Sequence, residues 1–268
     1  MNSLIELFQK KALKIEKRFR LVISTCILSL LMLISTFFLF DKAVIFLGLF
    51  FIIGYFVTYF SLLEGIERIE WFTLFLMPII LTVSFYLFYF LFPVRWLTRL
   101  PFILLYGISI YAVLLCENIF NVGVEKSLQL YRAAFSINFF YQMVVSFLFN
   151  NALFSFKLHF IFNVLSVFVT AFLLGYQLIW SVRLDLRIER NSILYGFFIA
   201  LVLGELTLIG SFIPLKPTIL ALFLASSYYS LSGLIYNHLS QRLFKETLRE
   251  FVAVWVVVFA VTLLSLRW

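Results

Sequence analysis

The chain alternates long apolar runs with short polar segments, and nine of the runs carry almost no charge. A helix needs roughly 20 residues to cross the hydrocarbon layer of a bilayer, and its backbone must satisfy its own hydrogen bonds where water is absent. Each run therefore predicts a membrane-spanning helix. The nine predicted spans are Leu21–Phe40, Ala43–Leu63, Trp71–Phe92, Pro101–Phe120, Ala133–Asn150, His159–Trp180, Ile193–Phe212, Pro217–Tyr236 and Phe251–Leu266.

Two polar segments have the periodicity of amphipathic helices. Between Ser3 and Arg20, apolar residues recur at three- and four-residue steps, and a basic face suits the anionic lipids of a cytoplasmic leaflet. A solvated basic tail that only sets the orientation explains the same charges. The segment Asn237–Glu250 predicts a second surface helix. We divide the chain into a cytoplasmic basic segment, residues 1–20, and one transmembrane helical domain, residues 21–268.

The composition excludes a soluble globular domain. Hydrophobic residues make up 64% of the 268 residues and charged residues only 13%, against about 45–50% and about 25% in ordinary soluble domains. So few charged side chains cannot cover a soluble protein of this size. The chain is therefore predicted to be an integral membrane protein in contact with the lipid bilayer.

The distribution of charge predicts the topology. With nine spans and a cytoplasmic N-terminus, 15 of the 21 Lys and Arg residues lie on the cytoplasmic side and six lie outside. This distribution obeys the positive-inside rule, and omitting the fourth span would remove the bias. We predict an all-α, polytopic helix bundle with its N-terminus inside and its C-terminus outside. The net charge of +8 follows from this orientation, so no nucleic-acid partner is expected.

Few residues could support soluble-enzyme chemistry. The sequence contains no phosphate-binding glycine loop and no His or Cys cluster with metal-ligand spacing. Cys26 and Cys116 lie in apolar runs, and His159 and His238 fall on opposite faces of the predicted membrane. We therefore expect no metal and no cofactor, and an enzyme is not the favoured class.

Glu205 is the most unusual residue within a predicted span. A charged side chain at this depth costs about 2.5–3.5 kcal/mol on insertion scales, so it usually faces protein or water. Gly196, Ala200 and Gly204 recur at four-residue steps on the same helix and would admit a close neighbour. Equal counting back from the turn near Leu215 places Glu205 level with the serine-rich part of the next span. The predicted ligand or proton site is Glu205 with Ser226, Ser227 and Ser230.

Two interpretations of this carboxyl remain open. It binds a proton or cation, or it is a protonated acid that hydrogen-bonds to serine and holds two helices together. Amides in the fifth and sixth spans form a secondary set, with Asn138 and Gln142 four residues apart. Interhelical amide hydrogen bonds are common in membrane bundles, so we interpret this pair mainly as packing.

The segment Glu117–Arg132 has a helical polar stripe that begins where the fourth span ends. Its candidate polar residues are Glu117, Asn118, Asn121 and Arg132, interpreted as a ligand site or as an interfacial elbow. Over about residues 100–150 the chain resembles an uncharacterised family of multi-pass membrane proteins from uncultured, small-genome bacteria. The resemblance implies a bacterial inner-membrane location and no particular activity.

Three classes of function follow from these features. The favoured class is a proton- or cation-linked carrier of small solutes, centred on Glu205. The helix count and the acidic loops Glu64–Glu70 and Asp185–Glu189 resemble intramembrane prenyltransferases, which implies a lipid or prenyl transferase as an alternative. A non-catalytic membrane scaffold or assembly partner is the third class. The sequence does not identify a protein partner.

The topology predicts the side of the membrane on which the C-terminus lies. A periplasmic reporter enzyme fused after Trp268 should be active, because nine crossings carry that end outside. A reporter that works only in the cytoplasm, fused at the same position, should be inactive. The reverse result would show that a span is missing or miscounted.

Overall fold

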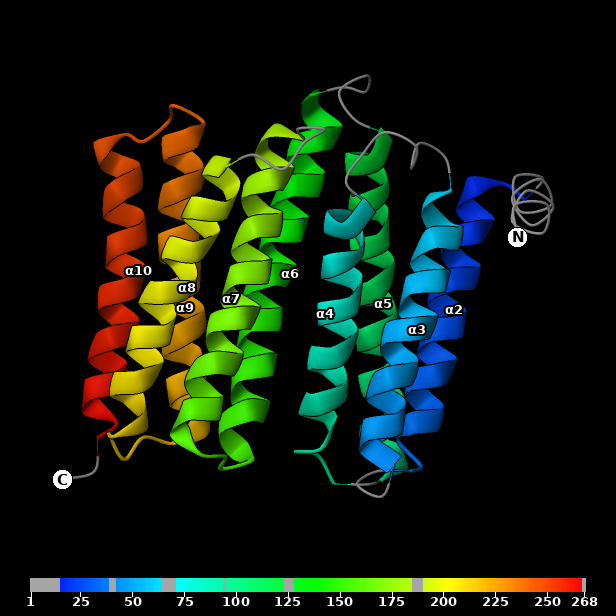
Figure 1. Cartoon of the computed structure of the whole chain (residues 1–268), viewed down its shortest axis with the longest axis horizontal. Coiled ribbons are helices and arrows are strands. Elements are labelled where there is room, and N and C mark those ends of the chain that lie inside the picture. The colour runs from blue at the N-terminus through cyan, green and yellow to red at the C-terminus, as the bar shows by residue number, and fades with distance from the viewer. Residues whose placement is uncertain are drawn as a thin grey trace. The chain divides into compact units, whose positions relative to one another are not determined.

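The computed structural model describes residues 15–38, 42–63, 71–93, 95–122, 128–184 and 190–266, which form long helices joined by short connections (Figure 1). Within these ranges nine helices are long and apolar enough to cross a membrane, which agrees with the predicted all-α, multi-pass architecture. The helices are α2 (Lys17–Ser35), α3 (Ala43–Leu62), α4 (Trp71–Tyr89), α5 (Trp96–Val122), α6 (Leu128–Ser155), α7 (Phe160–Arg183), α8 (Arg190–Ser211), α9 (Pro217–Leu239) and α10 (Lys245–Leu264).

The observed helices extend beyond several predicted spans. α5 begins five residues before Pro101, and α6 runs from Leu128 to Ser155 through polar residues at both ends. A hydropathy pattern ends where the side chains become polar, whereas backbone hydrogen bonds continue through an interfacial polar turn. The amphipathic helix predicted over Ser3–Arg20 lies mostly outside the described residues.

The surface helix predicted in Asn237–Glu250 is wrong. α9 continues to Leu239, and α10 already begins at Lys245. Between them Gln241 adopts a positive φ of 55°, and the N–H of Arg242 donates to the carbonyl of Asn237 over 2.8 Å. The four-residue spacing of apolar side chains in this segment therefore belongs to the end of one span and the start of the next.

The chain forms two compact units, of which the first is Met1–Asn138. In this unit α2 packs on α3 and α5, and α4 also packs on α3 and α5. Buried aromatic rings hold α4 against α5: Tyr89 and Phe102 have ring centroids 5.0 Å apart. The hydroxyls of Thr82 and Tyr106 share a hydrogen bond of 2.9 Å. Aromatic packing and one buried hydroxyl pair thus join these two helices.

The second unit, Phe139–Trp268, contains the rest of α6 and helices α7 to α10. The backbones of α7 and α8 meet at Gly196, where a Cβ atom would lie only 3.1 Å from the backbone nitrogen of Tyr176. Gly204 similarly faces Phe168 of α7. The small residues predicted on this helix therefore do admit a close neighbour. α9 packs against α7, α8 and α10, and most of its length is buried.

The glycine contact predicts a large difference between two similar substitutions. Gly196→Ala should destabilise the protein by about 1–3 kcal/mol, because the new methyl group meets backbone atoms that cannot rotate away. Gly48→Ala is the matched control, since nothing lies within 4 Å of a Cβ atom there. Reversible unfolding of the full chain in detergent micelles measures both effects. Equal stability of the two variants would contradict the packing of α7 on α8.

Candidate functional site

Glu205 lies on the exposed face of α8, away from both helix ends. Six residues separate it from the end of the helix at Ser211, which corresponds to about 9 Å along the axis. Its neighbours one turn away on the same face are Leu201 and Leu208, and both are also exposed. The carboxyl group therefore sits on an apolar surface at the depth of a membrane span.

Glu205 is exposed, whereas the three predicted serines of α9 are buried. Gly210 of α8 faces Leu220 of α9, where a Cβ atom would lie 2.5 Å from a methyl carbon. Equal counting from this contact puts Glu205 level with Ala225, at the start of the serine-rich part of α9. The buried residues of α8 lie away from the exposed face that carries Glu205; one of them, Gly204, contacts α7. Depth depends only on the length of the turn, whereas direction depends on how the helices rotate to bury their small residues.

The three predicted serines have other partners. Ser226 and Ser227 donate to the carbonyl of Phe223 in their own helix, over 2.9 and 2.8 Å. Ser230 donates to the carbonyl of Phe251 over 3.1 Å. The indole nitrogen of Trp255 donates to the Ser227 hydroxyl over 2.9 Å. These hydroxyls donate within α9 or to the backbone of α10, and no hydrogen bond between them and Glu205 is seen among the described residues.

A buried polar network instead joins α6, α7 and α9. The amide of Gln142 donates to the amide oxygen of Gln177, and the hydroxyl of Tyr228 donates to the Gln142 oxygen over 2.7 Å. All three side chains are almost completely buried. Both hydrogen bonds link different helices. The network is uncharged, so it holds three helices together without the free-energy cost of burying an ion.

The network belongs to a longer polar stripe on α6. Asn138, Gln142, Ser146 and Asn150 follow one another at four-residue steps, and all four are buried. The Asn150 amide donates to Ser146 over 3.4 Å. Beside this stripe, Asn151 accepts a hydrogen bond of 3.4 Å from Thr218 of α9. The prediction from the sequence included only the first two members, although the same four-residue period extends to the other two.

In the first unit, a second polar region lies at the end of α5. Glu117 is fully buried, and the amide of Asn121 donates to the carbonyl of Leu62 over 2.9 Å. Asn118 is half-buried, whereas Arg132 is exposed at the start of α6. The segment therefore separates into a buried part on α5 and an exposed part on α6. The rings of Phe120 and Tyr131, with centroids 6.1 Å apart, join the two parts.

Arg20 also belongs to this polar region, although the sequence pattern did not indicate it. The contact of Gly107 with Ser29 fixes the register of α5 against α2, and equal counting from it places Arg20 within about one residue of the level of Glu117. Arg20 is fully buried on the first turn of α2. Its position beside five other basic residues suggested a surface tail, and only the packing of α2 on α5 distinguishes it from them.

Arg99 is a second buried cation, near the start of α5. Its guanidinium donates to the carbonyl of Thr36 over 3.2 Å and lies 4.3 Å from the ring centroid of Phe37. Thr36 is the C-terminal cap of α2, where carbonyl groups lack helical partners. Arg99 therefore stabilises the end of a neighbouring helix, and we assign it a structural role.

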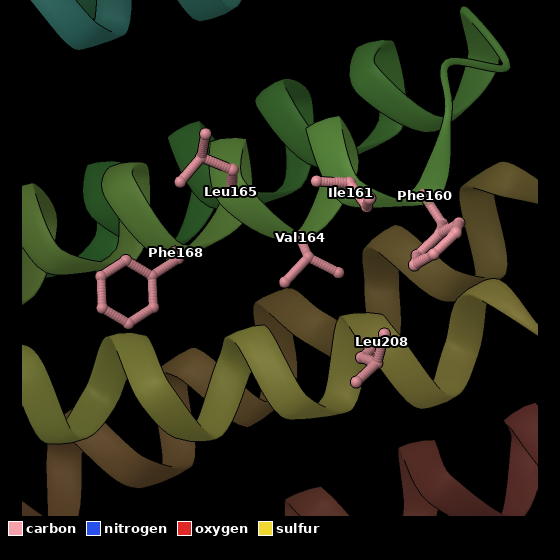
Figure 2. A pocket seen from close by; sticks show the side chains of 6 residues that line it. All are labelled: Phe160, Ile161, Val164, Leu165, Phe168 and Leu208. Atoms are coloured by element: carbon pink, nitrogen blue, oxygen red, sulfur yellow. The ribbon is translucent and has the colours of Figure 1, made fainter.

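An apolar hollow of about 420 Å³ lies on the α7 and α8 side of the second unit (Figure 2). Leu208 of α8 forms one wall, one turn from Glu205. Side chains of α7 form the rest, and none of the lining residues is polar. The lining residues are Phe160, Ile161, Val164, Leu165, Phe168 and Leu208.

Metal binding has no candidate among the described residues, where no three His, Cys, Asp or Glu side chains gather. The acidic loops Glu64–Glu70 and Asp185–Glu189, on which the transferase alternative depends, lie outside these residues. That alternative therefore stays a prediction from the sequence.

The polar network predicts coupled effects of two substitutions. Gln142→Leu removes both hydrogen bonds and Tyr228→Phe removes one, so the two losses of stability should not add. We expect a coupling free energy of about 0.6 kcal/mol in a double-mutant cycle, the average for interhelical hydrogen bonds in membranes. Tyr229→Phe is the control, because its ring stacks on Phe139 and no described hydrogen bond uses its hydroxyl. Strictly additive losses would contradict the network.

Comparison with known proteins adds a family to this description. A family model described as "Protein of unknown function (DUF5656)" matches residues 63–265, from the end of α3 to the end of α10. No curated protein and no solved structure matches the chain. The family assignment agrees with the expected resemblance to uncharacterised proteins, while the bacterial source remains an expectation. Because the match covers about three quarters of the sequence, the chain belongs to the DUF5656 family.

Proposed function

We propose that this multi-pass membrane protein is an assembly partner that holds another transmembrane segment against α8. The observation that carries the proposal is the exposure of Glu205 on an otherwise apolar face of a span. The function is structural: the protein supplies a rigid membrane surface on which a complex forms. This was the third class considered from the sequence, and the geometry favours it over the other two.

The physical argument concerns the surroundings of the carboxyl group. Hydrocarbon chains neither donate nor accept hydrogen bonds, so a carboxyl that faces them loses its hydration without compensation. A charged group at such a depth is unfavourable by about 2.5–3.5 kcal/mol on insertion scales. A protein partner with a hydrogen-bonding side chain at the same depth removes most of this cost. Glu205 therefore drives association at this face.

The buried polar residues support the same conclusion by contrast. Gln142, Gln177 and Tyr228 bond to each other inside the second unit, and Ser226 bonds within its own helix. Their hydrogen bonds stabilise the bundle itself. Glu205 has no such partner among the described residues, so its contribution is to contacts outside the unit.

A second candidate is the carrier predicted from the sequence. The buried polar stripe of α6 supports it, since Asn138 and Asn150 are 12 residues apart and the stripe extends for about 18 Å along the helix. In a carrier, Glu205→Gln should stop proton-linked flux in proteoliposomes, because the amide cannot release a proton. In an assembly partner the same variant should keep its contacts, because the amide still forms hydrogen bonds.

We place the protein in the bacterial inner membrane as part of this proposal. Lys10, Lys11 and Lys14, which precede α2, and the exposed Arg18 on its first turn support contact with anionic lipids at the cytoplasmic surface. The apolar helices supply the contact with the bilayer.

Site-specific photocrosslinking in native membranes tests the assembly proposal. A photoreactive residue at Leu201, on the face of Glu205, should give protein adducts. The same residue at Val257 is the control: it is exposed on α10, seven residues from the helix end at Leu264, and should react with lipid. Adducts with lipid alone at both positions would contradict the proposal.

A further inference from the structure

The exposed face of α8 has the spacing of a helix-pairing seam. Its residues follow one another at alternating steps of four and three, so that every second member is seven residues further along, the repeat that keeps two helices in contact along their length. Each of the six side chains is exposed in the structure, and Glu205 is the one polar member. The seam consists of Leu194, Phe198, Leu201, Glu205, Leu208 and Phe212.

We propose that this seam pairs with the α8 seam of a second copy of the chain, around a two-fold axis normal to the membrane. The inference rests on the proposed function and names its partner. At the centre of the contact, the two Glu205 carboxyls hydrogen-bond to each other, with at least one of them protonated. Apolar side chains above and below exclude lipid from this pair.

The depth of Glu205 makes the contact self-complementary. Copies of one chain insert with the same orientation, so their α8 helices are parallel and equivalent residues lie at the same depth. In a two-fold contact, residues at the axis face their own equivalents. Each Glu205 carboxyl therefore meets the Glu205 carboxyl of the other copy, which lies at the same depth. A single polar residue in an apolar seam also fixes the register of the two helices.

The distribution of cations makes an ion pair between copies untenable. Every described Lys or Arg within a helix lies among its first or last five residues, whereas Glu205 is the seventh residue from the end of α8. Two of these cations, Arg20 and Arg99, are also buried within the first unit. At this level the described helices of a second copy thus offer Glu205 another carboxyl and no positive charge. A neutral or singly charged acid pair also avoids the desolvation of two opposite ions.

The hollow beside the seam gives the second helix a place to pack. It begins at Leu208, a member of the seam, and continues over α7 through Val164 and Phe168 (Figure 2). Lipid can cover an apolar groove, so the hollow alone would not indicate a partner. Together with the polar centre of the seam, it supplies the room for large side chains of a partner helix.

Disulfide crosslinking between two differently tagged copies tests the pairing. The native Cys26 and Cys116 are first replaced by alanine, and Cys is introduced at Leu201 or Leu208. Seam positions should crosslink under mild oxidation in membranes, because two Cys residues that face each other across a parallel pair come within disulfide reach. Val257→Cys on α10, exposed at a similar distance from a helix end, is the control and should remain reduced.

Each outcome distinguishes this inference from the proposed function. Disulfides between the two tags at the seam alone support pairing of α8 with α8. Photoadducts at Leu201 with a different protein, without disulfides between the tags, overturn the pairing and leave the assembly function intact. Photoadducts with lipid alone overturn both. Crosslinks of equal yield at Val257 indicate random collision and also overturn the pairing.

Two substitutions of Glu205 test the role of the carboxyl in the same assay. Glu205→Gln should retain seam crosslinking, because an amide pair forms reciprocal hydrogen bonds at the same depth. Glu205→Leu should weaken association about tenfold in detergent titrations, which corresponds to the loss of a strong interhelical hydrogen bond. Because Glu205 is exposed in the single chain, Glu205→Leu should keep the stability of the monomer. Unchanged dimerisation of Glu205→Leu would overturn the proposed contact.

Discussion

The absence of hydrogen-bonding groups in hydrocarbon is the constraint that shapes every part of this protein. It forces the backbone into helices, because each N–H and C=O must find a partner within its own segment. It also acts on every polar side chain in the spans. Each must bond to the backbone of its own helix, bond to a neighbouring helix, or meet something outside the folded unit.

Most polar side chains in the described spans bond to the backbone of their own helix or to a neighbouring helix. Thr82, Ser84 and Ser109 each donate to a carbonyl four residues earlier in the same helix. Gln142 and Gln177 bond between helices and are almost completely buried. Close backbone contact at Gly196 contributes in a different way, since it increases dispersion contacts where no hydrophobic effect drives helices together. Hydrogen bonds and close packing together therefore hold the second unit.

Glu205 differs from these residues, because its carboxyl faces the outside of the folded unit. Its helix buries Gly196 and Gly204 against α7, and this rotation turns the carboxyl outward. The close packing of α7 on α8 and the exposure of Glu205 are consequently two results of one arrangement. The same rotation also exposes the heptad-spaced seam. The packing that stabilises the second unit and the surface proposed for assembly thus lie on different faces of α8.

The class of protein and the number of spans could be predicted from the sequence alone. Hydrophobic length and charge bias depend on the bilayer, which acts on every residue independently of its neighbours. That Glu205 lies near the level of the serine-rich part of α9 likewise follows from the short turn between two spans. The four-residue period that joins Asn138 to Gln142 is also visible in the order of the residues.

The direction in which each polar residue faces came only from the packing of the helices. This packing leaves Glu205 exposed, encloses Arg20, and separates buried Glu117 from exposed Arg132. Neither hydropathy nor spacing contains this information, because a helix can rotate about its axis without changing the depth or period of its residues. The rotation is set by contacts such as Gly196 with Tyr176, which join residues 20 positions apart across two helices.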